Sequence, residues 1–284
     1  MQPERVTDDI FIFTSELYAQ VTAGVIITSV GAIIIDTLAY PQETKRIKRF
    51  VQEHLDLDVK YVVNTHYHAD HTTGTCFFPG VSIIAHEKCR EFLNIRGRES
   101  LENARGSSSD MDDVELILPD MVFDKQFTLF IGNKTLRFMH TPGHSMDLIS
   151  CIVEEDQVLF ASDSLMPIPY FVDGSFDDTV ATLKKFQEWT FESIVQGHGE
   201  VVLRGEIKEK LADDLSYLSQ LSEAVDNAIQ ADNWQSSLDK ITVDDCGKSR
   251  VLMNGMVGQL HRQNVIALAE QRHIANGVRP DNSV

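Results

Sequence analysis

Three imidazoles and one carboxylate follow a short apolar run of the chain, at His66, His68, Asp70 and His71. The apolar run, Tyr61–Val63, predicts a buried strand, so the four side chains lie in the loop that leaves its end. Imidazole nitrogens and carboxylate oxygens are the ligands that zinc and other borderline cations accept. Alternation places His66 and His68 on one side, while the turn of the chain can send the other two elsewhere. The segment therefore suits two neighbouring cations better than one.

Three later residues each follow an apolar stretch and lie beside a glycine or a turn residue: His144, Asp163 and His198. A single histidine or aspartate at a strand end is more often a cap or a turn residue than a ligand. Loops at one edge of a sheet can nevertheless converge on one site, and the shared placement of the three residues indicates such convergence. They extend the set of candidate metal ligands.

The elements that must position these residues mix strands and helices up to about residue 205. Short apolar runs predict strands at residues 9–13, 24–28, 32–36, 60–64, 81–85, 127–131, 135–140, 148–153, 158–161 and 193–196. Amphipathic spacing predicts helices at residues 41–55, 86–93 and 176–189. Between Gly97 and Pro119 the pattern gives way to charges and small residues, which indicates a long mobile loop or an interrupted helix.

Beyond residue 205 the periodicity is helical only. Apolar residues recur every three or four positions from Ile207 to Ile229, which predicts one long amphipathic helix. A second helix is expected from about Arg250 to His273. We therefore expect a catalytic domain at residues 1–205 and a helical C-terminal extension at residues 206–284. Because exposed amphipathic helices need a partner surface, the extension is expected to cover the cleft or to form a homodimer.

Composition limits the classes of partner that the protein is expected to bind and the cellular location that we expect. The chain of 284 residues carries a formal net charge of −18, which repels phosphate backbones and anionic lipids, so we expect no nucleic-acid and no membrane partner. The chain has no apolar run long enough to cross a bilayer, and its first residues lack the regions of a signal peptide. Four cysteines without CxxC spacing indicate reduced thiols. A cytoplasmic location is the simplest expectation.

In order and spacing, the candidate ligands resemble those of the metallo-β-lactamase-fold hydrolase superfamily. The resemblance covers about residues 9–203 and rests on His66-x-His68-x-Asp70-His71, Gly143-His144, Ser162-Asp163 and Gly197-His198-Gly199. It implies an α/β fold, a four-layer αββα sandwich with metal ions at one edge. It also implies a first ion bound by His66, His68 and His144 and a second ion bound by Asp70, His71 and His198, with Asp163 as the bridging carboxylate.

The aspartate at position 163 narrows the branch of the superfamily that the sequence resembles. With an aspartate here, the sequence is similar to glyoxalase II, the lactonases and related hydrolases of thioesters, esters and phosphodiesters. Dedicated β-lactamases typically lack this bridging aspartate. The resemblance therefore implies a dinuclear hydrolase of a small ester, lactone or thioester. The alternatives are β-lactamase activity, phosphodiesterase activity, or a mononuclear iron oxygenase similar to the persulfide dioxygenases, which use ligands of the His66, His144 and Asp163 type only.

The mechanism that follows uses two cations about 3.5–4 Å apart, which share a water and lower its pKa toward ~7. The resulting bridging hydroxide would attack the carbonyl of a small-molecule substrate, and Asp70 would orient it as well as bind metal. Zn²⁺ is the expected ion, although the same ligands accept iron or manganese according to supply. Metal removal or loss of a ligand is thus expected to abolish turnover.

Specificity is expected to come from segments whose patterns are less informative. The stretch from Gly97 to Pro119 is long enough to act as a lid. Met166–Phe171, directly after the predicted bridging aspartate, either lines the site with apolar groups or is a structural loop stiffened by proline. Within it, Tyr170 is a candidate hydrogen-bond donor to a substrate oxygen. The remaining histidines are interpreted as surface or packing residues: His54, His86, His140, His261 and His273.

Overall fold

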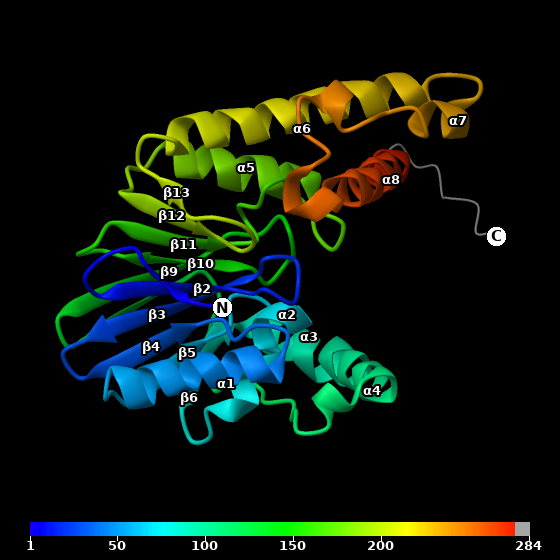
Figure 1. Ribbon diagram of the computed structural model, residues 1–284. Coiled ribbons are helices and arrows are strands. Elements are labelled where there is room, and N and C mark those ends of the chain that lie inside the picture. Colours follow the sequence, from blue (N-terminus) through cyan, green and yellow to red (C-terminus); the bar gives the residue numbers. More distant parts are fainter. Residues whose placement is uncertain (276–284) are drawn as a thin grey trace.

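Two β-sheets lie face to face between two layers of helices in the computed structural model, which describes residues 1–275 (Figure 1). In the first sheet, β1 to β4 run antiparallel to their neighbours, and β4 to β7 run parallel. Its seven strands follow one another in chain order: β1 (Pro3–Arg5), β2 (Ile10–Thr14), β3 (Thr22–Thr28), β4 (Gly31–Ile35), β5 (Val59–Val63), β6 (Ser82–His86) and β7 (Met121–Phe123).

The second sheet is antiparallel except for one parallel pair, β11 with β12. Its strand order is β13-β12-β11-β10-β9-β8. The strands are β8 (Gln126–Ile131), β9 (Lys134–His140), β10 (Ile149–Val153), β11 (Val158–Ser162), β12 (Ser193–Gln196) and β13 (Val202–Leu203).

The facing sides of the two sheets form one apolar core. Ile33 and Val63 of the first sheet and Phe138 and Phe160 of the second belong to the same cluster of buried side chains. β-branched and aromatic residues fit such a pleated, buried surface, which explains why these runs form strands. Because both sheets are packed on this side, their strand ends are held rigidly at the edges of the sandwich.

Helices cover both outer faces. On the first sheet, α1 (Pro41–Arg49) continues as a π-helical turn (Phe50–His54) and packs through Ile47 and Val51. The same side carries α2 (Ala69–Thr72), α3 (Glu87–Phe92), a π-helical turn (Leu93–Gly97) and α4 (Arg98–Ser107). The second sheet is covered by α5 (Phe176–Gln187), α6 (Ile207–Ile229), α7 (Trp234–Leu238) and α8 (Val257–Ala275). The predicted four-layer αββα sandwich is confirmed.

The C-terminal helices share a core with the second sheet. Leu218 of α6 and Leu268 of α8 belong to one buried cluster with Leu159 of β11 and Phe186 of α5. The boundary predicted at residue 205 stays a prediction, and residues 276–284 of the predicted extension lie outside the described residues. Within residues 1–275, none of the helices combines the length and the apolar character needed to cross a bilayer.

Candidate metal centre

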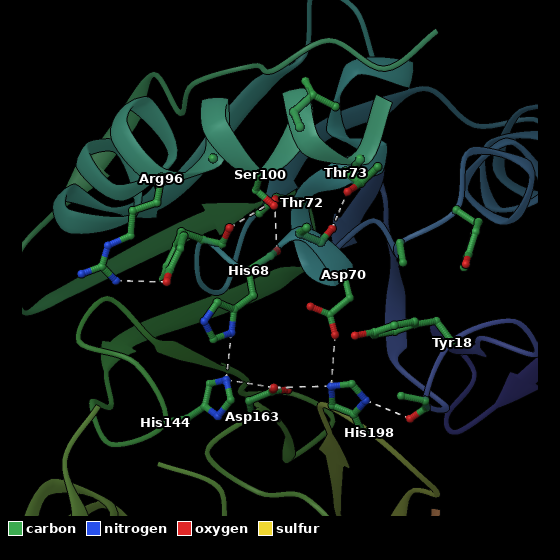
Figure 2. Close-up of a pocket in the computed structure, with 18 of the residues that line it drawn as sticks. Tyr18, His68, Asp70, Thr72, Thr73, Arg96, Ser100, His144, Asp163 and His198 are labelled. Atoms are coloured by element: carbon green, nitrogen blue, oxygen red, sulfur yellow. Dashed lines mark hydrogen bonds and ion pairs between the residues drawn. The ribbon is translucent and has the colours of Figure 1, made fainter. Parts of the chain in front are cut away.

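Strand ends at one edge of the sandwich bring all the predicted ligands together. His66 and His68 follow β5 directly, and Asp70 and His71 lie on the short helix α2. The other three follow β9, β11 and β12: His144, Asp163 and His198. Figure 2 shows side chains from these separate elements pointing toward one another across the pocket. Because β5, β11 and β12 belong to packed sheets, the ligands are held by a rigid framework rather than by mobile loops.

Three imidazoles form the first part of the cluster. Nδ1 of His68 lies 2.9 Å from Nε2 of His66 and 3.0 Å from Nε2 of His144. His66 and His144 are buried, and His68 is half-buried. Three ring nitrogens that face one point at these distances make a site for a cation that accepts imidazole ligands.

A second group consists of Asp70, His71 and His198, with Asp163 between it and the first. Nε2 of His198 lies 3.4 Å from Oδ2 of Asp70 and 3.4 Å from Oδ2 of Asp163. Oδ1 of Asp163 lies 3.3 Å from Nε2 of His71, and its Oδ2 lies 3.2 Å from Nε2 of His144. One carboxylate therefore faces imidazoles of both groups, which is where a bridging ligand would lie.

The outer nitrogens of the imidazoles are held by fixed partners. Nδ1 of His144 faces the carbonyl oxygen of Tyr170 at 2.9 Å, so it must donate and leave Nε2 free to bind a cation. Nδ1 of His71 lies 2.8 Å from Oδ2 of the buried Asp36. Nε2 of His68 lies 3.3 Å from Oδ2 of Asp173. These contacts fix the ring orientations before any ion is bound.

The two halves of the cluster differ in protonation. Burial lowers the pKa of His66 well below its ordinary value and that of His144 to about 4, so both rings are neutral and offer lone pairs. Burial also acts to lower the pKa of His198, but the carboxylates of Asp163 and Asp70 raise it to about 10. Burial acts to raise the pKa of both carboxyls, yet the neighbouring imidazoles hold it below the ordinary range. The second half thus holds ionised carboxylates beside protons that a cation can replace.

Two buried ligand atoms make no hydrogen bond, Nε2 of His71 and Oδ1 of Asp163. Buried polar atoms are rarely left in this way, and a divalent ion in contact with both would satisfy them. Space for the carboxylate depends on Gly197, because a Cβ there would come within 1.7 Å of Oδ1 of Asp163. The donor set and its unsatisfied atoms therefore fit divalent metal ions.

Tyr18 is a residue of this pocket that the sequence pattern did not indicate. It lies in the turn between β2 and β3, and Figure 2 shows its phenol pointing toward Asp70 and His198. Burial and the charge of Asp70 raise the pKa of this phenol, which keeps it protonated and able to donate. The next two residues, Ala19 and Gln20, have φ of +45° and +54°, a left-handed conformation that L side chains rarely adopt. Tyrosine in a turn carries no local signal for such a role.

The sequence pattern also gave no indication that Asp173 and Arg96 would lie beside the ligands. Asp173 accepts from the Tyr67 hydroxyl at 2.7 Å and pairs with Arg96 at 3.0 Å, at the same time as it contacts His68. The predicted substrate donor, Tyr170, lines the pocket, but its hydroxyl donates to Oε1 of Gln263 at 2.9 Å, so its role toward substrate stays a prediction.

The other histidines lie outside the three potential metal-binding groups found among the described residues. His86 and His140 pack against each other with ring centroids 4.2 Å apart. His261 lies 3.1 Å from the hydroxyl of Tyr217 in the C-terminal core. The interpretation of these three as packing residues is confirmed.

Comparison with known proteins assigns the family. The family model described as the Metallo-beta-lactamase superfamily matches residues 18–225. The chain therefore belongs to the metallo-beta-lactamase superfamily, whose members generally bind divalent metal ions. The matched range begins at Tyr18, includes every predicted ligand and ends within α6.

Among curated relatives, the thioesterase pkgB of Emericella nidulans is 25% identical over 174 residues, which are 60% of this chain and 43% of that protein. An atrochrysone carboxyl ACP thioesterase of Claviceps purpurea is 22% identical over 219 residues, 76% of this chain and 64% of that protein. The chain spans about half the length of the first curated relatives it matches. The solved structure of a metallo-beta-lactamase from Pontibacter korlensis superposes with a TM-score of 0.63 at 20% identity, over 77% of this chain and 98% of that chain, and shows the shared fold.

Proposed function

We propose that this chain is a dinuclear metal-dependent hydrolase that cleaves a small ester, lactone or thioester. The observation that carries the proposal is the position of Asp163, whose two oxygens face imidazoles of both ligand groups. His66, His68 and His144 would hold one ion, and Asp70, His71 and His198 the other. When bound, divalent cations supply Lewis acidity, which polarises an acyl carbonyl and makes water nucleophilic near neutral pH.

The chain's own residues orient the reactants. The carboxylate of Asp70, ionised beside His71 and His198, would accept a hydrogen bond from the attacking water and so fix its direction. The Tyr18 phenol stands on the opposite side of the pocket mouth from Arg96 and donates a hydrogen bond to a substrate oxygen. The carbonyls of Ala19 and Tyr170 accept hydrogen bonds from Nδ1 of His198 and His144, so Nε2 is the nitrogen that each ring turns toward the cluster.

Thioester hydrolysis is the preferred form of this proposal. Three of the relatives that match this chain carry the name thioesterase, although the chain spans only 43%, 64% and 36% of their lengths. An acyl thioester also has the carbonyl that the proposed chemistry requires. β-Lactam and phosphodiester cleavage remain alternatives within the same chemistry, because the same water could attack either centre.

Metal quantification combined with a substrate panel tests the proposal. We expect two divalent ions per chain and turnover of a thioester, ester or lactone, with zinc as the expected metal. The panel should include a β-lactam and a phosphodiester, since faster turnover of either would reassign the substrate. A single iron per chain with oxygen consumption in the presence of a persulfide would contradict the proposal and favour the mononuclear oxygenase.

Three further expectations belong to this proposal and await their own tests. The substrate is a small molecule, the C-terminal helices form a homodimer or cover the cleft, and the protein acts in the cytoplasm. Sedimentation equilibrium of the purified chain distinguishes a dimer from a monomer. Fractionation of the source cells tests the location.

A further inference from the structure

The cavity in front of the ligand cluster has two apolar walls that come from outside the sheets. Its volume of about 710 Å³ lies in the range of small-molecule sites. The α4 wall follows β6 and consists of Leu93, Leu101, Ala104, Met111, Val114 and Leu116. The α8 wall consists of Met253, Met256 and Leu260. In Figure 1, α4 and α8 extend from opposite outer layers on the same side of the sandwich.

Charge is nearly absent from this lining. Among the described lining residues outside the ligand cluster, the charged side chains are Arg96 and Glu115, which cancel. Arg96 is already engaged, because it pairs with Asp173 at 3.0 Å and lies over the rings of Phe92 and Tyr67. The lining therefore has no spare cation to pair with a phosphate or a carboxylate.

The walls are adaptable as well as apolar. Methionines stand on both of them, Met111 on the α4 wall and Met253 and Met256 on the α8 wall. The unbranched thioether side chain fits irregular apolar shapes and aromatic faces. The α8 wall also lies beyond residue 225, where the family match ends.

We propose that the two walls bind the acyl group of the substrate, and that this group is uncharged and apolar. The inference rests on the hydrolase function proposed above and adds the class of acyl group to it. In a thioester or ester the apolar surface is carried mainly by the acyl chain, whereas common thiol and alcohol carriers bear amides, hydroxyls or phosphates. The two walls offer apolar contacts for the acyl chain, and the described lining has no spare side-chain cation for the phosphates of a carrier.

Thioesters of N-acetylcysteamine with acetyl, butanoyl, octanoyl and succinyl groups test the proposal on the metal-loaded protein. Each buried methylene adds favourable transfer free energy, so we expect kcat/KM to rise about 100-fold or more from acetyl to octanoyl. Succinyl, a charged analogue of butanoyl, should fall at least about 10-fold below it. Hydrolysis of the octanoyl thioester should also exceed that of S-octyl thioacetate, in which the apolar chain is on the leaving group.

Binding provides a readout that needs no turnover. The ketones S-(2-oxodecyl)-N-acetylcysteamine and S-(2-oxopropyl)-N-acetylcysteamine are uncleavable analogues of a long and a short thioester. Calorimetry should give at least about 10-fold tighter binding for the long one. Met256→Glu and Leu101→Glu place a charge on one wall each, and both should reduce the octanoyl-to-acetyl ratio of kcat/KM at least about 10-fold.

The matched control is Ile266→Glu on α8, because Ile266 is 41% exposed, much like Met256 at 38%, but does not line the cavity. This control should keep the wild-type ratio. Equal kcat/KM for acetyl and octanoyl, or a preference for succinyl or for S-octyl thioacetate, would overturn the acyl assignment and leave the hydrolase proposal standing. Failure to hydrolyse any thioester, ester or lactone would instead overturn the hydrolase proposal.

Discussion

The imidazole of His198 donates from Nδ1 to the main-chain carbonyl of Ala19, 2.9 Å away and 179 residues earlier in the chain. The same turn accepts a hydrogen bond from the Gly199 amide at the carbonyl of Gln20, also at 2.9 Å. Left-handed φ angles at Ala19 and Gln20 cost energy that these hydrogen bonds help to offset. The turn that carries Tyr18 and the loop that carries His198 therefore form one unit.

Replacing His198 should distinguish the two proposed ion sites, because His198 belongs to only one of the two ligand groups. We expect His198→Gln to reduce bound metal from two ions per chain to about one and to lower kcat by roughly 1000-fold, since one half of the site loses a ligand. Metal analysis after gel filtration measures the first effect and a steady-state assay the second. His54→Gln, at an exposed histidine outside the cluster, is the control and should retain both ions. Two tightly bound ions in His198→Gln would contradict its assignment as a ligand.

Asp173 is expected to position His68, because Oδ2 of Asp173 lies 3.3 Å from the Nε2 that points away from the cluster. Asp173→Asn keeps the shape and removes the charge, and should lower metal affinity about 10-fold to 100-fold. Chelator competition measures this change. Asp177→Asn, at an exposed position on α5, is the control. Unchanged affinity for both ions in Asp173→Asn would show that the contact does not support the site.

The hydroxyl of Tyr18 should contribute to turnover rather than to folding. Tyr18→Phe keeps the ring, so we expect kcat to fall about 10-fold with little change in melting temperature. Tyr170→Phe tests the residue that the sequence suggested; its hydroxyl already donates to Gln263, and the expected loss is smaller. A larger loss in Tyr170→Phe than in Tyr18→Phe would reverse the assignment of the donor.

His86, which lies outside the metal centre, should make the free energy of unfolding depend on pH. Burial, then the neighbouring His140, lower the pKa of His86 from 6.5 to about 4. Because the folded state resists protonation of His86, the contribution of this side chain to the free energy of unfolding is fully present above pH 6.5. It is lost as the pH falls toward 4, by about 1–2 kcal/mol at pH 5. His86 accepts from the Lys88 amide at the start of α3, a role that asparagine also fills. Between pH 7 and pH 5, the free energy of unfolding of wild type should therefore fall by about 1–2 kcal/mol relative to that of His86→Asn, as measured by denaturant titrations. Parallel curves would contradict this.

Asp214 of α6 pairs with two lysines, and one of them, Lys210, links the helix to Met166 near the metal centre. It is fully buried, with Lys210 Nζ at 2.6 Å and Lys248 Nζ at 2.7 Å, and Lys210 also donates to the carbonyl of Met166. Asp214→Asn leaves the Lys210 ammonium without its counter-charge, while Lys248 keeps its ion pair with Asp213, and should cost about 3–5 kcal/mol in the free energy of unfolding. Urea titration measures the loss. Glu209→Gln, exposed on the same helix, should stay within about 0.5 kcal/mol of wild type.

The candidate ligands could be found from the sequence because each follows an apolar strand, and residues at the ends of packed strands meet at one edge. The long helix from Ile207 to Ile229 was predicted with the bounds it has, since its periodicity is uninterrupted. Short elements could not be predicted, because they have too few residues to show a hydrophobic periodicity: α2 has four residues and β13 has two. The segment after Gly97 proved to be an interrupted helix, α4 followed by a 3₁₀ turn at Ser109–Met111.

The residues around the ligands were harder to find, because contacts distant in sequence decide their roles. Asp173 meets His68 across 105 positions, and nothing near it in the chain marks it as a partner of a histidine. Asp36 is different, since it directly follows β4 in the same way that Asp163 follows β11. That placement could have indicated Asp36, whereas the roles of Tyr18 and Arg96 depend on the fold.

The bond between His198 and Ala19 has a consequence for the order of events in a cell. A nascent chain that has not yet emerged past Gly199 lacks His198, the last of the candidate ligands. It also lacks the end of β12, which places His198 beside the turn between β2 and β3. Six of the seven donors precede His198 in the chain, but the complete set exists only after most of the polypeptide has left the ribosome. The complete donor set that the proposed dinuclear centre needs is therefore available only late in biogenesis, and the cation that would fill it would depend on supply at that stage.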